Sequence, residues 1–151
     1  MALDREALVV ALLDRLKERV AGVNLWSRRA LAPQEITVPT AVLLLQRMQS
    51  PKIDSGLPPV WDLDLEVVAI VVCERADESP DTKLNAMVKE IEEALALQPG
   101  ESQPLEGGDE LDTTLDGRAV WCRISGDVET LPGQTNGQGI AIVPITIRAW
   151  Q

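Results

Sequence analysis

The sequence predicts an α+β domain in which two helices pack on one face of a largely antiparallel or mixed sheet that ends in a C-terminal β-hairpin. Three observations predict this fold. Apolar residues recur with helical spacing over residues 4–20 and again over residues 80–98, and they alternate over residues 60–74. Two weaker alternating segments, 118–129 and 140–150, flank a glycine-rich stretch. The length of 151 residues fits one domain spanning residues 1–151.

The first helix is predicted over residues 4–20. Asp4 is its expected N-cap, because an aspartate side chain can accept hydrogen bonds from the free N–H groups of the first turn. Gly22 is expected to end it, and residues 23–34 are interpreted as a loop or arm. The side chains expected to face the core are Leu8, Val9, Leu12, Leu13, Leu16 and Val20.

The second helix has a clear start signal. Ser79 is the expected N-cap and Pro80 the first helical residue, and we expect the helix to end at Pro99 and Gly100. Residues 99–110 are polar and rich in helix breakers, so they are interpreted as a long loop. The expected buried stripe consists of Leu84, Met87, Val88, Ile91, Ala94 and Leu95.

Residues 36–48 predict a buried strand with Pro39 near its start, and residues 50–59 a turn-rich connector. Residues 60–74 then carry apolar side chains at every odd position from Trp61 to Cys73. The even positions are acidic at first and become apolar from Val68 onward. The face formed by the odd positions should therefore be buried along the whole strand, and the face formed by the even positions only in its second half. Unbroken, this strand would span roughly 50 Å, so we expect a bend or an overhang.

The last two alternating segments predict a hairpin with a long loop at residues 132–139, after a turn at Asp116 and Gly117. Pro144 lies in the closing strand and has no N–H to donate to a neighbouring strand. The closing strand is therefore expected to lie at a sheet edge or to be bulged.

Several residue types are missing, and their absence limits the chemistry. The chain has no His, Tyr or Phe, which excludes imidazole bases, histidine zinc ligands and phenolic acids. Cys73 and Cys122 are far apart in sequence, and we interpret both as buried thiols in a reducing compartment, with a disulfide as the alternative. No segment is apolar enough to span a membrane and the start does not resemble a signal peptide, so a cytoplasmic origin is expected.

The formal net charge of −10 is unevenly distributed. Residues 1–52 carry eight basic and five acidic side chains, whereas residues 53–151 carry six basic and nineteen acidic ones. Such a surface should repel nucleic acid, so specific nucleic-acid binding is not expected. The asymmetry is either a lopsided solubility surface or a sign that complementary faces pair head to tail in an oligomer.

Three groups of residues are candidates for a functional site. Asp62, Asp64 and Glu66 place carboxylates on one strand face, which is either a magnesium site or, as we favour, a solvated or pore-facing surface. Residues 133–139 are glycine-rich but lack the Lys-Ser or Lys-Thr of a phosphate loop, so they are interpreted as a hairpin loop. Arg28 and Arg29 are either solvated or paired with an acidic neighbour.

No catalytic, cofactor or metal-ligating residue is predicted. The four tryptophans, Trp26, Trp61, Trp121 and Trp150, are expected in the core or a subunit interface.

The order of these segments resembles a known family. A starting helix leads to a proline-flanked strand at residues 39–47, to Trp-Asp-Leu-Asp-Leu-Glu-Val-Val at 61–68, and to the helix entry Ser-Pro-Asp-Thr-Lys-Leu-Asn at 79–85. Thr-Leu-Asp-Gly-Arg-Ala-Val-Trp at 114–121 and Ile-Val-Pro-Ile-Thr-Ile at 142–147 follow. This pattern is similar to the tail terminator proteins of long-tailed bacteriophages, the family of the lambda minor tail protein U.

The resemblance implies a structural virion protein of the phage tail or neck, assembled in the host cytoplasm. Such a protein forms a homo-oligomeric ring of six that caps the tail tube, stops its polymerisation and presents the surface to which the head-tail connector protein binds. Its partners would be its own copies, the tail tube protein and the connector protein, and DNA would pass through the ring without specific binding. Membranes and cofactors play no part. Candidate interface or lumen residues are Arg28, Arg29, Asp62, Asp64, Glu66, Gly133 and Gln138, with the acidic loop 101–112 at the lumen or rim.

Three alternatives stay open at this point. The chain could be another neck or head-tail joining protein, or a tail tube subunit, of the same kind of particle. A small metal-dependent hydrolase built on the acidic strand and a monomeric binding module are the alternatives from other classes. A tube subunit would polymerise alone, a hydrolase would show chelator-sensitive turnover, and a binding module would sediment as a single 16.5 kDa species.

Overall fold

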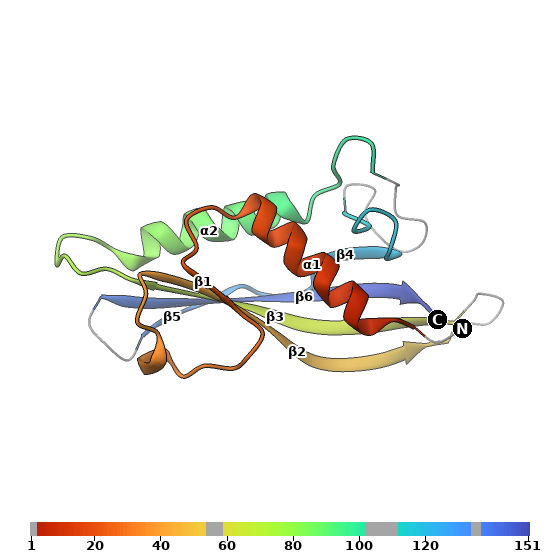
Figure 1. Cartoon of the computed structure of the whole chain (residues 1–151), viewed down its shortest axis with the longest axis horizontal. Helices are drawn as coiled ribbons and strands as arrows, with labels where there is room; N and C mark the ends of the chain where they lie inside the picture. Colours follow the sequence, from red (N-terminus) through yellow and green to blue (C-terminus); the bar gives the residue numbers. More distant parts are fainter. Residues whose placement is uncertain (1–2, 54–58, 102–111, 134–136) are drawn as a thin grey trace.

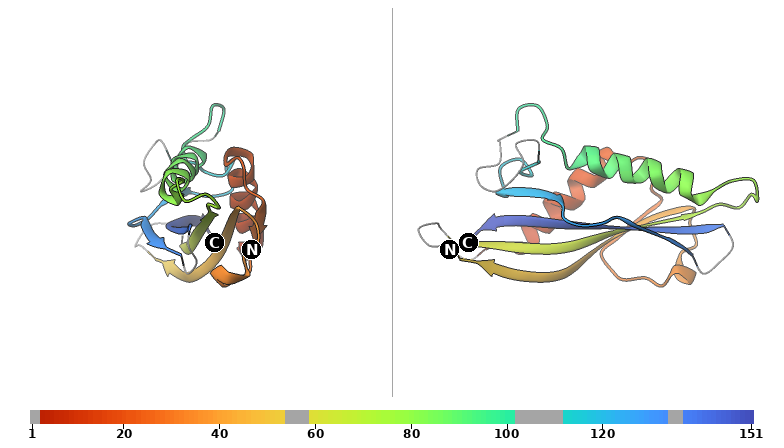
Figure 2. Two further views of the ribbon diagram at one scale, coloured as in Figure 1. Left: turned by 90° about the vertical axis from the view of Figure 1, so that its left-hand side faces the viewer. Right: turned by 180° about the vertical axis from the view of Figure 1, so that it is seen from behind.

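The computed structural model describes residues 3–53, 59–101, 112–133 and 137–151. In this part of the chain, two helices lie on one face of a long twisted sheet (Figures 1 and 2). The helices are α1 (Arg5–Arg19) and α2 (Pro80–Ala94), and a short 3-10 turn, η1 (Pro33–Glu35), lies on the other side of the sheet. The predicted fold class is confirmed.

The described sheet has six strands in the order β1-β2-β3-β6-β4, and β5 pairs with β6 beside β4. Its centre consists of three strands of 13 residues each, β2 (Thr40–Lys52), β3 (Val60–Val72) and β6 (Gln138–Trp150). The outer strands are β1 (Leu25–Ser27), β4 (Trp121–Ile124) and β5 (Glu129–Pro132). β1 runs parallel to β2 and every other pairing is antiparallel, so the sheet is mixed.

The strict alternation in β3 sets which side of the sheet meets the helices. Its odd-numbered residues, such as Leu65 and Val67, are buried in the main core with the apolar stripes of α1 and α2. Strand side chains point to alternate faces, so the even-numbered residues lie on the opposite side. Val68 and Ile70 there join a second, smaller cluster under the chain around η1, whose members include Ile36 and Leu43. Apolar packing on this second face therefore begins halfway along the strand, as expected, but the first half is not open to solvent, because Asp62 is buried there.

Both helices begin as predicted. The Asp4 side chain accepts a hydrogen bond from the Ala7 N–H at 3.0 Å, and Gly22 adopts a positive φ of 75° just after α1. α2 starts at Pro80, but it ends at Ala94, earlier than the predicted stop at residues 99–100. The chain instead forms an isolated bridge between Ala96 and Asp112.

The closing strand β6 is an interior strand, so the expectation of an edge position is wrong. It lies between β3 on one side and β4 and β5 on the other. Pro144 faces the break between β4 and β5, where residues 125–128 leave the ladder, and its carbonyl accepts the Ser125 N–H at 3.0 Å. β6 is not bulged either, because its register with β3 is unbroken; Pro144 is tolerated because the ladder on its other side is interrupted between β4 and β5.

Other boundaries also differ from the predictions. Residues 23–34 include β1 in addition to irregular chain, and β2 extends to Lys52, into the segment interpreted as a connector. The segment 118–129 forms a strand only over β4, and β5 lies partly in the expected loop. β3 pairs along its whole length and has no overhang, and the irregularity falls instead on β2, where the register shifts at Arg47. Residues 54–58, 102–111 and 134–136 of the predicted loops lie outside the described residues.

Candidate functional site

The three carboxylates of the acidic face on β3 are each bound by a side chain of a neighbouring strand. Asp62 is the first of them. Arg148 on β6 lies directly opposite Asp62 and donates two hydrogen bonds to its carboxylate, from Nε at 2.7 Å and from Nη2 at 2.9 Å. Hydrogen bonding to Asp62 raises the pKa of Arg148. Asp62 is only 8% exposed, so its charge is neutralised inside the protomer.

The other two carboxylates of this face also have partners. The Thr146 hydroxyl donates to Asp64 Oδ1 at 2.6 Å, and Arg47 Nε lies 3.6 Å from Glu66 Oε1. Side-chain donors therefore already engage all three carboxylates. Among the described residues, no group of three or more His, Cys, Asp or Glu side chains converges in a way that could hold a metal ion.

Arg28 and Arg29 follow β1 and differ in their surroundings. Arg28 donates through Nη1 and Nη2 to the two carboxylate oxygens of Glu6 on α1 and through Nη2 to Gln46 on β2 at 3.3 Å. The hydrogen bond from Arg28 lowers the pKa of Glu6. The predicted acidic partner of Arg28 thus exists within the same chain. Arg29 is exposed, and its backbone N–H bonds the Ser27 hydroxyl at 3.0 Å.

Gly133 and Gln138 face each other across the β5–β6 connection. The Gly133 N–H donates to the Gln138 carbonyl at 2.9 Å, and a Cβ at Gly133 would lie 2.3 Å from Gln138 Oε1. The Gln138 amide donates to the Pro33 carbonyl at 3.1 Å, and the residue is 5% exposed. Gln138 therefore ties the start of β6 to η1, and it is buried within the protomer.

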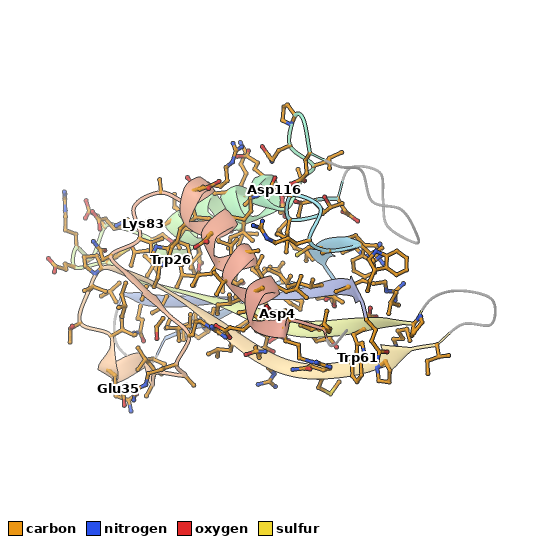
Figure 3. All side chains as sticks on the ribbon, turned by 45° about the vertical axis from the view of Figure 1, so that its right-hand side comes forward. Asp4, Trp26, Glu35, Trp61, Lys83 and Asp116 are labelled. Carbon is orange, nitrogen blue, oxygen red and sulfur yellow. The ribbon has the colours of Figure 1, made fainter. Side chains whose placement is uncertain are left out.

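Trp121 and both cysteines are buried, whereas Trp26, Trp61 and Trp150 are only partly buried. The Trp121 ring is 2% exposed and contacts the guanidinium groups of Arg123 and Arg148, at 4.0 and 4.8 Å from its centroid. Cys73 and Cys122 are buried and unpaired, as interpreted from the sequence. Trp61 lies near the start of α1 (Figure 3), and the Arg5 guanidinium is 4.6 Å from its ring centroid.

A buried polar cluster around Arg15 was not predicted. Arg15 is on α1 and is 6% exposed. Its Nη1 donates to Thr113 Oγ1 at 2.9 Å and its Nη2 forms an ion pair with Glu101, whose side chain is 1% exposed. Asp116 Oδ1 is 3.4 Å from the same nitrogen. A signal was present in the sequence, because Arg15 follows Leu12 by three residues and so falls on the apolar stripe of the helix.

Glu101 accepts hydrogen bonds from four residues, including the Thr114 N–H, which lies 3.3 Å from Oε1. Its Oε1 accepts from the Thr113 hydroxyl at 2.7 Å, and its Oε2 accepts from Arg15 and from the Asp116 N–H at 3.2 Å. Burial by itself raises the pKa of Glu101, but hydrogen bonds from Arg15, Thr113 and the Asp116 backbone outweigh it and lower the pKa. The cluster ties α1 to the chain that follows α2.

The backbone next to this cluster is in a sparsely populated conformation. Leu115, Asp116 and Gly117 have consecutive positive φ angles of 51°, 59° and 84°. Leu115 is 2% exposed and lies in the main core, so packing holds the turn in place. Figure 3 shows Asp116 on this turn, beside the helices. A groove of about 350 Å³ separates the turn from the outer surface of α1.

The two edges of the sheet are open at opposite ends in the described part of the chain. β1 covers residues 41–43 of β2, and no described strand pairs with the outer edge of residues 46–52. On the other side, β5 pairs with β6 and its four residues are all exposed. A groove of about 270 Å³ lies beside β5, lined by Pro80, Asp81, Thr130, Leu131, Pro132, Gln138 and Gly139.

No protein-family model and no curated protein matches the sequence. Within the described residues, neither helix is long and apolar enough to cross a membrane.

Proposed function

We propose that this chain is a structural assembly protein that forms a closed ring of its own copies, and that it serves as the tail terminator of a long-tailed bacteriophage. In this role the ring caps the tail tube, stops its polymerisation and presents a surface to the head-tail connector protein. The order of the sequence segments supports the phage assignment. The α+β fold, with two helices on one face of the sheet, is the one expected from those segments.

The main observation in favour of a ring is that the two open sheet edges of the described chain differ in the charge of their side chains. The free part of β2 carries Lys52 and also Arg47, whose guanidinium lies 3.6 Å from Glu66 of the same chain, whereas Glu129 lies on β5 and Asp127 just before it. A contact between two unlike patches is heterologous, so each copy can bind one neighbour through each patch. Such contacts close into a ring when the rotation between copies allows it. They continue as an open polymer when it does not, which would instead fit a tail tube subunit.

The acidic strand face remains our candidate for the lumen. Arg148 neutralises Asp62 and Arg47 lies near Glu66, so this face is close to charge balance and offers no cluster of free cations. A channel wall of this kind would let DNA pass, because phosphates are retained by clustered lysines and arginines. The double substitution Asp64→Asn with Glu66→Gln leaves the Asp62–Arg148 pair intact. Unchanged assembly and infectivity in this variant would remove these two side chains from the lumen.

Native mass measurement combined with negative-stain imaging of the purified protein tests the ring. We expect a discrete species of six copies that appears as a closed ring and does not lengthen with concentration. A polymer of indefinite length would overturn the terminator in favour of a tube subunit. A chain that stays at 16.5 kDa over the accessible concentration range would overturn the ring altogether.

A further inference from the structure

Two large apolar side chains protrude at the end of β2 that β1 leaves uncovered. Met48 is 68% exposed and Ile53 is 82% exposed, the two highest values among the large apolar side chains described. Arg47 and Lys52 lie beside them, and both are exposed. Met48 and Ile53 lie five residues apart on one exposed stretch of chain, and exposed apolar side chains of this size are found at protein contact surfaces. We call residues 47–53 the β2 knob.

The groove beside β5 has the complementary properties. Leu131 and Pro132 line it from β5 and Pro80 lines it from α2, so part of its wall is apolar. Leu131 is 43% exposed, and Val128 nearby is 36% exposed. Asp81 is the charged residue in its lining, and two further acidic residues, Glu129 on β5 and Asp127 just before it, lie nearby outside the lining; all three are exposed. We call this the β5 groove.

We infer that copies of this chain join head to tail by seating the β2 knob of one copy in the β5 groove of the next. The inference rests on the proposed function only in taking a second copy of the chain as the partner. Apolar side chains enter a partly apolar groove, while Lys52 approaches the carboxylate of Glu129 and the other acidic groups around it. Neither surface can bind itself in this way, because knob against knob would bring together cations and groove against groove would bring together anions.

The position of the two surfaces allows one copy to use both at once. Residues 48–52 pair with residues 60–64 of β3, which lie opposite residues 146–150 of β6. β5 pairs with residues 139–142, toward the other end of β6. The knob and the groove therefore lie on opposite edges and at opposite ends of the sheet. Every copy then has one donor surface and one acceptor surface, which is the requirement for a head-to-tail ring.

Side chains carry this contact, and the backbone edges contribute little. Pro51 lies within the knob and Pro132 within the groove, and neither has an N–H for a continuous ladder between copies. The bulge at Arg47 and the charge of Lys52 also discourage edge-to-edge strand pairing. The contact is consequently sensitive to the charge and size of the exposed side chains, which makes it testable by surface substitutions.

The test uses two charge reversals in the full-length chain, Lys52→Glu and Glu129→Lys. Each variant alone sets like charges against each other at every contact, and we expect the protein concentration for half-maximal assembly to rise about tenfold or more. An equimolar mixture restores opposite charges at every knob-groove contact if the two variants alternate. We therefore expect mixing to rescue assembly, with equal numbers of the two variants in each oligomer by native mass measurement.

Matched controls separate this contact from a general charge effect. Lys89 and Glu92 are exposed on α2, away from both surfaces, and Lys89→Glu and Glu92→Lys should assemble like the wild type. Circular dichroism and the melting temperature establish that each variant is folded. Met48→Ser should also weaken assembly without changing the melting temperature, because its side chain is exposed in the protomer.

The outcomes distinguish this inference from the proposed function. A wild-type ring whose assembly is unaffected by both reversals, or variants that fail to rescue each other, would overturn the knob-groove contact and leave the ring standing. A ring that depends on the contact but does not bind or cap phage tail tubes would overturn the terminator and leave the contact standing. A monomeric wild-type chain would overturn both.

Discussion

Arg15 and Glu101 form an ion pair that is closed to solvent, although 86 positions separate them in the sequence. Thr113 donates to the same carboxylate, and Asp116 contributes its backbone N–H. This cluster joins α1 to the chain between α2 and β4. A buried charge is costly unless it is paired and hydrogen-bonded, so each member depends on the others.

Replacing Arg15 by Met should lower the free energy of unfolding by about 3–5 kcal/mol, because it leaves the Glu101 carboxylate buried without its cation. Urea unfolding followed by circular dichroism measures this. Arg19→Met is the control, since Arg19 bonds Gln98 at the exposed surface and its loss should change stability by less than about 1 kcal/mol. Equal losses in the two variants would contradict a special role for the buried pair.

The stability should fall in acid in a way that depends on Glu101. The folded pKa of this carboxyl is below its ordinary value of 4.5, so its contribution is complete above pH 4.5 and is lost as the pH falls through the folded pKa. Glu101→Gln should be less stable than the wild type at pH 7, and the difference between the two proteins should shrink as the pH falls below about 4.5. Unfolding free energies measured across this range test it. A constant difference at every pH would show that Glu101 does not titrate in this way.

The turn at Asp116 should distinguish side chains by shape more than by charge. Its φ of 59° is tolerated by Asn and strained for a β-branched residue. Asp116→Val should therefore lower the free energy of unfolding by about 1–2 kcal/mol, whereas Asp116→Asn should change it little. Melting temperatures of the two variants provide the comparison. A loss in the Asn variant as large as in the Val variant would instead implicate the carboxylate contact with Arg15.

Both cysteines should be unreactive in the folded protein. Cys73 and Cys122 are buried, and burial raises the pKa of the Cys122 thiol, so little thiolate is available. We expect an aromatic disulfide reagent to modify both thiols rapidly in denaturant and only at the rate of unfolding in buffer. Fast labelling of either thiol under native conditions would show that the core opens locally around it.

Local patterns in the sequence were enough to predict the main elements. Asp4 and Pro80 marked the starts of the helices, and the alternation around Leu65 placed β3 and told which of its faces meets the helices. The same patterns misplaced Pro144. A proline predicts an interrupted ladder, but it does not tell whether the interruption comes from the sheet edge or from a break in the neighbouring strand.

Less of the candidate site than of the fold could be predicted from the sequence. Asp62, Asp64 and Glu66 were correctly placed together on one strand face, but their partners could not be named from sequence. Arg148 and Thr146 are more than eighty positions away along the chain, and the pairing register of β3 and β6 brings them opposite. Arg15 was not among the residues expected to face the core, because its polar partners come from beyond α2.

The amino-acid sequence alone determined the two helices, the long strands and the chemistry that its missing residue types exclude, but not β1, β5 or the end of α2. These properties follow from neighbours within a few positions of each other, through periodicity, capping and proline geometry. The tertiary structure decided the strand order, the ion pairs of Asp62 with Arg148 and of Glu101 with Arg15, and which two sheet edges lack a neighbouring strand in the described part of the chain. These features depend on which segments that are distant in sequence pack together. That packing is determined by how the whole chain buries its apolar side chains, and local sequence patterns do not specify it.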